Sequence, residues 1–109
     1  MGDFGVGMFS GLTGIFNWPN ASRDGFSLSQ NYPNPFSGNT NIDFEIAEKS
    51  FVSLKVVNVS GEELIELAGK EFLPGSYTVT FDASGFTKGI YFYSIKANGF
   101  SQTRKLIID

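Results

Sequence analysis

Cysteine and histidine are both absent from the 109 residues of this chain. Their absence excludes disulfides, thiol nucleophiles, Ser-His-Asp and Cys-His catalytic arrangements, and the usual zinc, haem and copper ligands. Small extracellular domains can be held together by core packing alone, so the lack of cysteine does not assign a compartment. We expect a protein that is not an enzyme and that binds no cofactor.

Basic clusters and long apolar runs are also missing. The chain has eight Lys and Arg and eleven Asp and Glu, which gives a formal net charge of −3. Among the basic residues, only Arg104 and Lys105 are adjacent in the sequence. We therefore expect no binding of nucleic acid. No run reaches the ~20 apolar residues of a membrane helix, and glycine interrupts the N-terminal segment where a secretory signal would be continuous. The glycines match no phosphate-binding spacing, so no small-molecule substrate is expected.

Aromatic residues and glycine are abundant instead, with twelve Phe, four Tyr, one Trp and thirteen Gly. In residues 1–25, glycines separate apolar residues, and turn-forming residues follow at 17–20 and 22–25. We expect this arm to end at a domain boundary near Gly25. Three interpretations of the arm stay open: the tail of a preceding segment, a docked extra strand, or an intermolecular arm through which the chain self-associates.

Period-2 alternation of apolar and polar residues recurs from Phe26 to the end of the chain. The dipeptide Asn98-Gly99 separates the last two segments and predicts a type I′ hairpin, because both of its positions need positive φ. The segments expected to form strands are 26–29, 42–46, 51–59, 63–68, 77–82, 90–97 and 100–108. Their spacing predicts an all-β domain over residues 26–109, an immunoglobulin-like or fibronectin-like sandwich of about seven antiparallel strands.

Two ligand hypotheses arise from the side chains. Carboxylates could bind calcium, but nothing in the sequence brings together Asp43, Glu45, Asp82 and Asp109, so we expect them to face solvent. Aromatic rings could bind carbohydrate, with Trp18 as the best candidate. Aromatics on alternate strand positions favour a core, however, and Tyr91 is expected to form a tyrosine corner, in which the hydroxyl bonds to upstream backbone.

Pro33 and Pro35 flank Asn34 and fix φ twice, so they exclude a helix and predict a rigid corner over residues 31–36. Four further motifs follow in order: Val52-Ser53-Leu54-Lys55-Val56, Leu73-Pro74-Gly75-Ser76-Tyr77, Gly89-Ile90-Tyr91-Phe92-Tyr93, and Lys105 near the end. This order resembles the C-terminal sorting domain of type IX secretion cargo from Bacteroidetes and related bacteria, over about residues 26–109. The matching positions are Pro33, Asn34, Pro35, Gly75, Tyr77, Gly89, Tyr91, Gly99 and Lys105.

The resemblance implies a non-enzymatic signal that directs cargo through the outer-membrane translocon, so that it is secreted or held at the cell surface. It also implies a sortase-like peptidase that often removes the domain and transfers the cargo to a surface glycolipid. Two departures are the lack of an export signal or cargo domain and the end at Asp109, where a more basic tail is usual. We expect an excised domain or the remnant of a longer precursor.

Two further expectations concern how this signal is handled. Recognition would use the exposed terminal hairpin and its edge backbone, in a mode akin to strand addition. Cleavage would fall within residues 17–25, the most exposed-looking segment. The alternative functions are a structural module whose arm docks on a neighbouring copy to build an oligomer or filament, and, ranked lower, a carbohydrate-binding sandwich.

Overall fold

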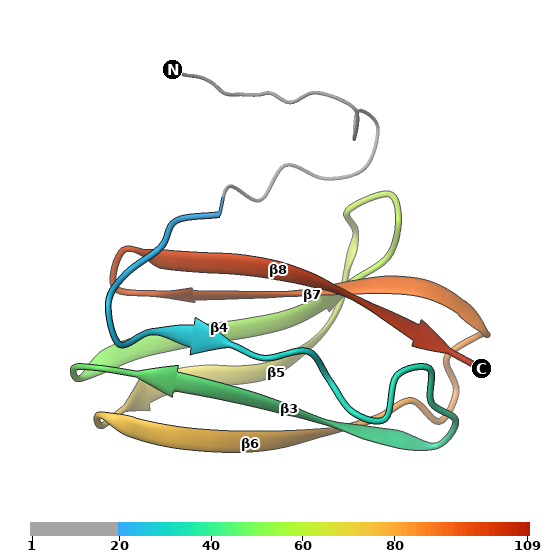
Figure 1. Cartoon of the computed structure of the whole chain (residues 1–109). Coiled ribbons are helices and arrows are strands. Elements are labelled where there is room, and N and C mark those ends of the chain that lie inside the picture. The colour runs from blue at the N-terminus through green and yellow to red at the C-terminus, as the bar shows by residue number, and fades with distance from the viewer. Residues whose placement is uncertain (1–19) are drawn as a thin grey trace.

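The computed structural model describes residues 20–109, which form two antiparallel sheets packed face to face (Figure 1). The three-stranded sheet has the order β2-β3-β6, and the four-stranded sheet has the order β5-β4-β7-β8. The strands are β2 (Ser27–Leu28), β3 (Asn39–Ile46), β4 (Ser50–Val57), β5 (Glu63–Phe72), β6 (Gly75–Asp82), β7 (Gly89–Ala97) and β8 (Phe100–Ile108). The predicted all-β sandwich of seven antiparallel strands is confirmed.

Strand β3 shows how the alternation builds the core. Ile42, Phe44 and Ile46 are buried, whereas Asp43 and Glu45 lie on the outer face of the sheet. Successive side chains of a strand point to opposite faces, so the pattern in the sequence fixes which face is covered. The same rule places Val52, Leu54 and Val56 of β4 in the core.

Strand β4 lies between β5 and β7 in the four-stranded sheet. This central place agrees with its nearly continuous apolar sequence, which predicted partial cover on both faces. Its outer face varies along the strand, since Val57 is buried while Phe51 is 61% exposed. Only part of that face is therefore covered.

The β7–β8 hairpin is confirmed in its turn geometry. Asn98 has φ 43° and Gly99 has φ 84°, so both positions are left-handed as a type I′ turn requires. The two strands then pair without a break from Ala97–Phe100 at the turn to Gly89–Ile108 at the far end. This register places the start of β7 beside the end of the chain.

Strand β5 is longer than the sequence predicted, since it continues past Ala68 to Phe72. The backbones of Gly69, Lys70 and Glu71 also pair with β4, and at an edge strand charged side chains can reach solvent. The pairing shifts register between Leu54 and Lys55 and again between Val56 and Val57. The strand is therefore both charged and irregular.

Two clusters of aromatic rings fill the space between the sheets. Phe44, Phe72 and Tyr77 lie with ring centroids 4.8–5.5 Å apart. A second chain of contacts runs through Phe36, Phe81, Phe86 and Tyr91 at 5.2–6.1 Å. Such pairs stabilise a fold by about 0.5–1.5 kcal/mol beyond their buried area. The rings on alternate strand positions thus serve the core, as expected.

Candidate functional site

The proline corner, residues 31–36, lies beside the end of β8, so residues far apart in the sequence meet near the C-terminus (Figure 1). Both proline peptide bonds, Tyr32–Pro33 and Asn34–Pro35, are cis. The corner itself was predicted, but nothing in the sequence indicated these isomers. Its side chains are largely at the surface, and Tyr32 is 58% exposed.

Asn31 anchors the corner from inside. Its side-chain nitrogen donates to Thr40 Oγ1 at 3.0 Å and to the Pro33 carbonyl at 3.2 Å. The Thr40 hydroxyl also donates to the Pro33 carbonyl, at 2.8 Å. Asn31 and Thr40 are both buried, and buried polar groups are stable in a core only when they are paired in this way. The network therefore fixes the path of the corner.

Tyr93 joins this network to the four-stranded sheet. Its hydroxyl donates to the Ser29 carbonyl at 2.6 Å and accepts from the Asn31 backbone N–H at 2.8 Å. The side chain is fully buried, and this burial raises its pKa to about 12, although the Asn31 hydrogen bond and the charge of Arg104 act in the opposite direction. The phenol thus stays neutral and keeps its role as a hydrogen-bond donor.

Strand β8 is an edge strand, but most of its edge is covered. Because Phe100 pairs with Ala97 at the turn, the residues whose N–H and C=O groups point outward are Ser101, Thr103, Lys105, Ile107 and Asp109. Ala21 pairs with Ser101 in both directions, at 2.8 and 3.0 Å. Farther along, Phe36 donates to the Ile107 carbonyl at 3.1 Å and accepts from the Asp109 N–H at 2.7 Å.

Three side-chain amides complete this cover. Asn20 Oδ1 accepts from the Thr103 N–H at 3.0 Å, and Asn34 Oδ1 accepts from the Ile107 N–H at 2.9 Å. Between them, Gln30 Nε2 donates to the Lys105 carbonyl at 2.7 Å. Side chains and short stretches of residues 20–36 therefore replace a neighbouring strand along β8.

The cover corrects one expectation drawn from the sequence. The edge backbone of the terminal hairpin is not exposed for strand addition, because residues 20–36 of the same chain occupy most of it. The alternating pattern of β8 shows only which face is buried. It could not show that parts of residues 20–36 lie along this edge and bond to it through backbone groups and amide side chains.

Two tyrosines bond to backbone in the same way. The Tyr91 hydroxyl donates to the Thr87 carbonyl at 2.7 Å, which confirms the bond predicted for a tyrosine corner. The Tyr77 hydroxyl makes the same contact with the Leu73 carbonyl, at 2.6 Å. In each case a glycine with φ of 145–152° lies two residues before the tyrosine. The repeated Gly-x-Tyr spacing could have predicted the second corner, which the sequence reasoning missed.

The motif residues fall at two ends of the sandwich. Gly89 pairs with Ile108, so the late-strand motif lies at the C-terminal end together with the proline corner. Gly75 pairs with Ile46, and Gly99 closes the hairpin, both at the opposite end. The structure thus brings together Pro33, Asn34, Pro35, Gly89, Tyr91 and, through its carbonyl, Lys105, but not Gly75, Tyr77 or Gly99.

A family model for the secretion system C-terminal sorting domain matches residues 30–109. The chain belongs to this family. Searches of curated proteins and of solved structures found no match. The matched stretch starts at Gln30, whose side chain donates to the Lys105 carbonyl. It contains the whole proline corner and strand β8, whose edge the corner helps to cover. The sorting domain is a signal for type IX secretion, and it directs export across the outer membrane to the cell surface or the medium.

The match also bears on catalysis and partners. A sorting domain of this family is not typically catalytic, and it interacts with the type IX secretion machinery. The calcium candidates were Asp43, Glu45, Asp82 and Asp109, and within residues 20–109 no group of three His, Cys, Asp or Glu side chains that could hold a metal occurs. Asp82 instead accepts from the hydroxyl and N–H of Ser84, which lowers its pKa.

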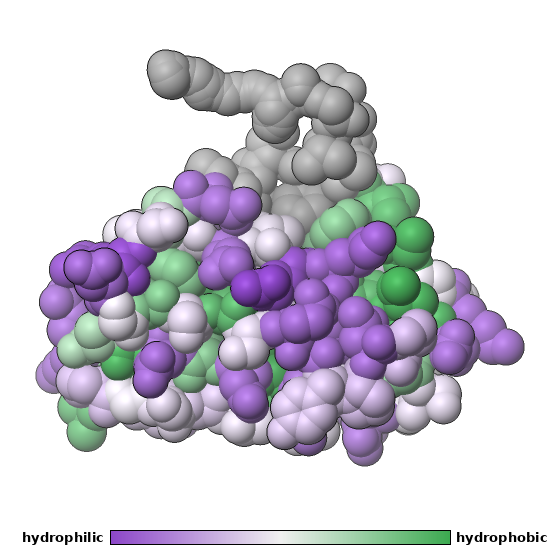
Figure 2. Space-filling model, viewed as in Figure 1, coloured by the Kyte–Doolittle hydropathy of each residue, from purple (hydrophilic) through white to green (hydrophobic). Residues whose placement is uncertain are grey.

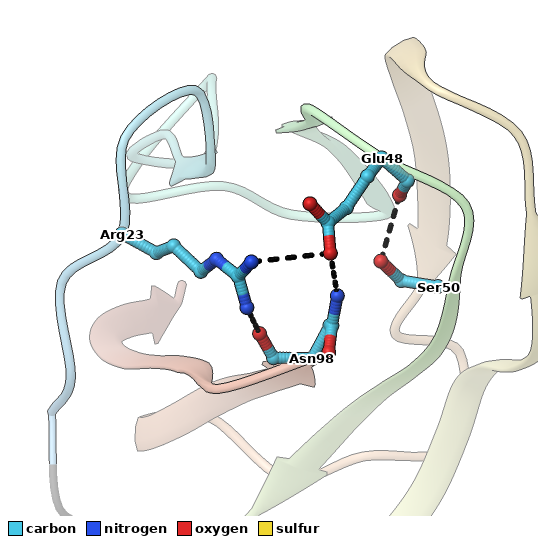
Figure 3. A network of polar contacts seen from close by, with 4 residues as sticks. All are labelled: Arg23, Glu48, Ser50 and Asn98. Atoms are coloured by element: carbon cyan, nitrogen blue, oxygen red, sulfur yellow. Dashed lines mark hydrogen bonds and ion pairs between the residues drawn. The ribbon is translucent and has the colours of Figure 1, made fainter.

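A polar network that the sequence reasoning missed closes the hairpin end of the sorting domain (Figure 3). Arg23 contacts the Asn98 carbonyl and lies 3.1 Å from Glu48 Oε1, which also accepts from the Asn98 side chain. The Ser50 hydroxyl donates to the Glu48 carbonyl at 2.7 Å. These contacts join the segment before β2, the β3–β4 turn and the hairpin turn.

Several expectations concern residues outside the described range. The glycine-rich part of the arm, and with it the proposed self-association through residues 1–25, lies mostly there, as does Trp18 of the carbohydrate hypothesis. These stay predictions, and so does the domain boundary at Gly25. Among the described residues, no helix has the length and apolarity needed to cross a membrane.

Proposed function

We propose that the outer-membrane translocon recognises this sorting domain as a folded unit, through the end of the sandwich where the proline corner meets the C-terminus. The observation that carries the proposal is the contact of Asn34 and Phe36 with Ile107. It joins the proline corner and the end of β8 into one surface. An unfolded tail could not present residues 73 positions apart side by side.

Asn34 and Asn20 provide a matched pair of variants for this proposal. Each accepts one N–H of β8 through its side-chain oxygen, but only Asn34 lies in the proline corner and inside the family match. A reporter with its own Sec signal is fused to the full chain in a type IX-competent host. We expect Asn34→Ala to reduce surface display several-fold while Asn20→Ala leaves it near the unsubstituted level.

The outcomes separate recognition from stability. Thermal unfolding of both purified variants shows whether their folds are comparable. Equal secretion of the two variants, both at the unsubstituted level, would contradict recognition through the corner. Equal loss in both would indicate that the machinery senses the whole covered edge of β8.

We further propose that a sortase-like peptidase cuts this domain from its cargo before Asn20, and that the cargo then passes to a surface glycolipid. From Asn20 onward the backbone is held, since Asn20 and Ala21 bond to β8 and Arg23 to the hairpin turn. A peptidase needs an extended and accessible substrate. Mass spectrometry of the released domain tests this, and an N-terminus after Ala21 would overturn it.

The domain itself has no catalytic role in this proposal. Its chain has no histidine or cysteine, and the carboxylates of Asp43 and Glu45 accept hydrogen bonds from Thr78 and Ser76. Such pairing leaves them as structural acceptors on an open sheet face. The type IX machinery supplies all the chemistry.

A further inference from the structure

Strand β6 is the outer strand of the three-stranded sheet and lies on the far side of the sandwich from β8 (Figure 1). It pairs with β3 over eight residues without a register shift. Ala83 donates to the Gly38 carbonyl, which sets the phase of the ladder, so Ser76, Thr78 and Thr80 direct their N–H and C=O groups away from β3. Within residues 20–109, no backbone group pairs with the outward N–H and C=O groups of these three residues.

The two outer strands of the four-stranded sheet, β5 and β8, have protected edges. Strand β5 carries two register irregularities and the charged residues Glu63, Glu66, Lys70 and Glu71, and the edge of β8 is covered by residues 20–36. Strand β6 has no charge from Gly75 to Phe81, no proline and no bulge. Proteins normally protect such an edge, since its unpaired groups invite another strand. The lower rim of Figure 2, on the side where Figure 1 places β6, shows pale residues with purple ones between them.

The surfaces that flank this edge differ in character. On the outer face, Asp43 accepts from the Thr78 hydroxyl at 2.6 Å and Glu45 from the Ser76 hydroxyl at 3.2 Å, and Asp82 ends the strand. Strands β2, β3 and β6 contain no Lys or Arg, so this face is acidic. On the inner face, Tyr77 and Val79 pack against the core but stay partly exposed at the edge.

We propose that the outer edge of β6 is a strand-addition site for an extended, basic segment of a partner protein. The segment pairs with the outward groups of Ser76, Thr78 and Thr80. Its Lys or Arg side chains alternate with small apolar ones, so that the basic residues lie over the acidic face and the apolar residues cover Tyr77 and Val79. A second copy of this chain fits less well, because it would bring two acidic faces together. The site is separate from the proline corner and does not depend on the proposed function.

A short peptide of alternating lysine and valine, added to the full chain, tests the site. Backbone amide exchange measured by NMR is the readout, because it reports each N–H separately. We expect the amides of Ser76, Thr78 and Thr80 to gain protection of about tenfold or more, while Tyr77 and Val79, already bonded to β3, change little. A peptide of alternating glutamate and valine should give no such gain.

Thr78→Pro is the matched variant. Proline removes an N–H that points outward, so the ladder to β3 keeps its bonds, and proline is tolerated at such edge positions. We expect this variant to bind the lysine–valine peptide about tenfold more weakly, whereas Thr78→Val, which keeps the N–H, binds within about twofold of the unsubstituted chain. Unchanged exchange at Ser76, Thr78 and Thr80 in the unsubstituted chain, or protection that maps to β5 or β8, would overturn the proposal whether or not Thr78→Pro folds.

Discussion

The side chain of Asn31 lies buried between Thr40 and Pro33 and donates to both. The cost of losing such a group comes from the partners that stay behind, since water cannot reach them. Tyr93 is a second residue of this kind, because its hydroxyl bonds on one side to Ser29 and on the other to the backbone of Asn31. Single residues therefore decide whether the proline corner keeps its place on the sheet.

Asn31→Ala should lower the free energy of unfolding by about 1–3 kcal/mol, because the Thr40 oxygen loses a buried donor. Asn39→Ala is the control, since Asn39 is exposed on the neighbouring strand and should change stability by less than about 0.5 kcal/mol. Urea unfolding followed by far-ultraviolet circular dichroism measures both. Equal effects in the two variants would show that the Asn31 network does not anchor the corner.

Tyr93 should make stability depend on pH at the alkaline end. Its pKa is raised from 10.0 to about 12 in the folded state, so the stabilisation is complete below pH 10 and is lost as pH rises through 12. Tyr93→Phe removes this dependence, which we expect to amount to roughly 1–3 kcal/mol between those limits. Denaturant unfolding across this pH range compares the two proteins. If the stability of the two proteins changed equally with pH, the Tyr93 phenol would not be the source of the dependence.

At the scale of strands and turns, the β7–β8 hairpin combines a left-handed turn with contacts from distant parts of the chain. Asn98 and Gly99 have left-handed φ values. Arg23 contacts the Asn98 carbonyl, and the Glu48 carboxylate accepts a hydrogen bond from the Asn98 side chain. Distant residues also complete β8, where the side-chain amides of Asn20, Gln30 and Asn34 take the place of a neighbouring strand. Each element is thus completed by residues from distant parts of the chain.

Gly99→Ala should destabilise the domain by roughly 1–2 kcal/mol, because a side chain is strained at φ 84°. Gly69→Ala is a matched comparison, since the atoms nearest to its new methyl group are the movable carboxylate end of Glu66, and this substitution should destabilise the domain less. Gly99→Asn should recover part of the loss, because Asn tolerates left-handed φ. Thermal unfolding midpoints rank the three variants, and a larger loss for Gly69→Ala than for Gly99→Ala would contradict this account.

For the whole molecule, the decisive feature is that residues 20–36 and the C-terminus hold each other. Phe36 pairs with Ile107 and Asp109, while its ring packs on Phe81 in the core. Ile108 is itself buried in the core cluster. The last residues are therefore part of the fold rather than an appended tail.

Deletion of residues 107–109 should reduce stability by about 3 kcal/mol or more, since it removes the buried Ile108 and the partners of Phe36 and Asn34. Asp109→Asn is the control, because it removes the charge but keeps the N–H that bonds to Phe36. We expect that substitution to be nearly neutral. Calorimetry on both proteins measures their stability. A deletion variant as stable as Asp109→Asn would mean that the contacts between residues 20–36 and the C-terminus contribute little to the stability of the fold.

The sequence by itself determined the class of this protein. Alternation along 42–46 and 77–82 identified strands and their buried faces, Asn98-Gly99 identified the hairpin, and the ordered motifs identified the family. These features are local, because side-chain direction and allowed φ depend on a residue and its neighbours. The proline corner was predicted for the same reason.

Only the tertiary structure decided which edges of the sandwich are covered. The side-chain bonds that cover β8 join residues 73 to 83 positions apart, such as Asn34 with Ile107 and Asn20 with Thr103. Neither hydrophobic periodicity nor a turn signal predicts these bonds. In the sequence, such an Asn or Gln has the pattern of any surface residue, and only the folded structure shows which backbone group lies opposite it. The coverage of β8, and the lack of a backbone partner beyond β6 within residues 20–109, follow from how the sheets pack and where the chain returns. Contacts of this kind form only when the whole chain is folded.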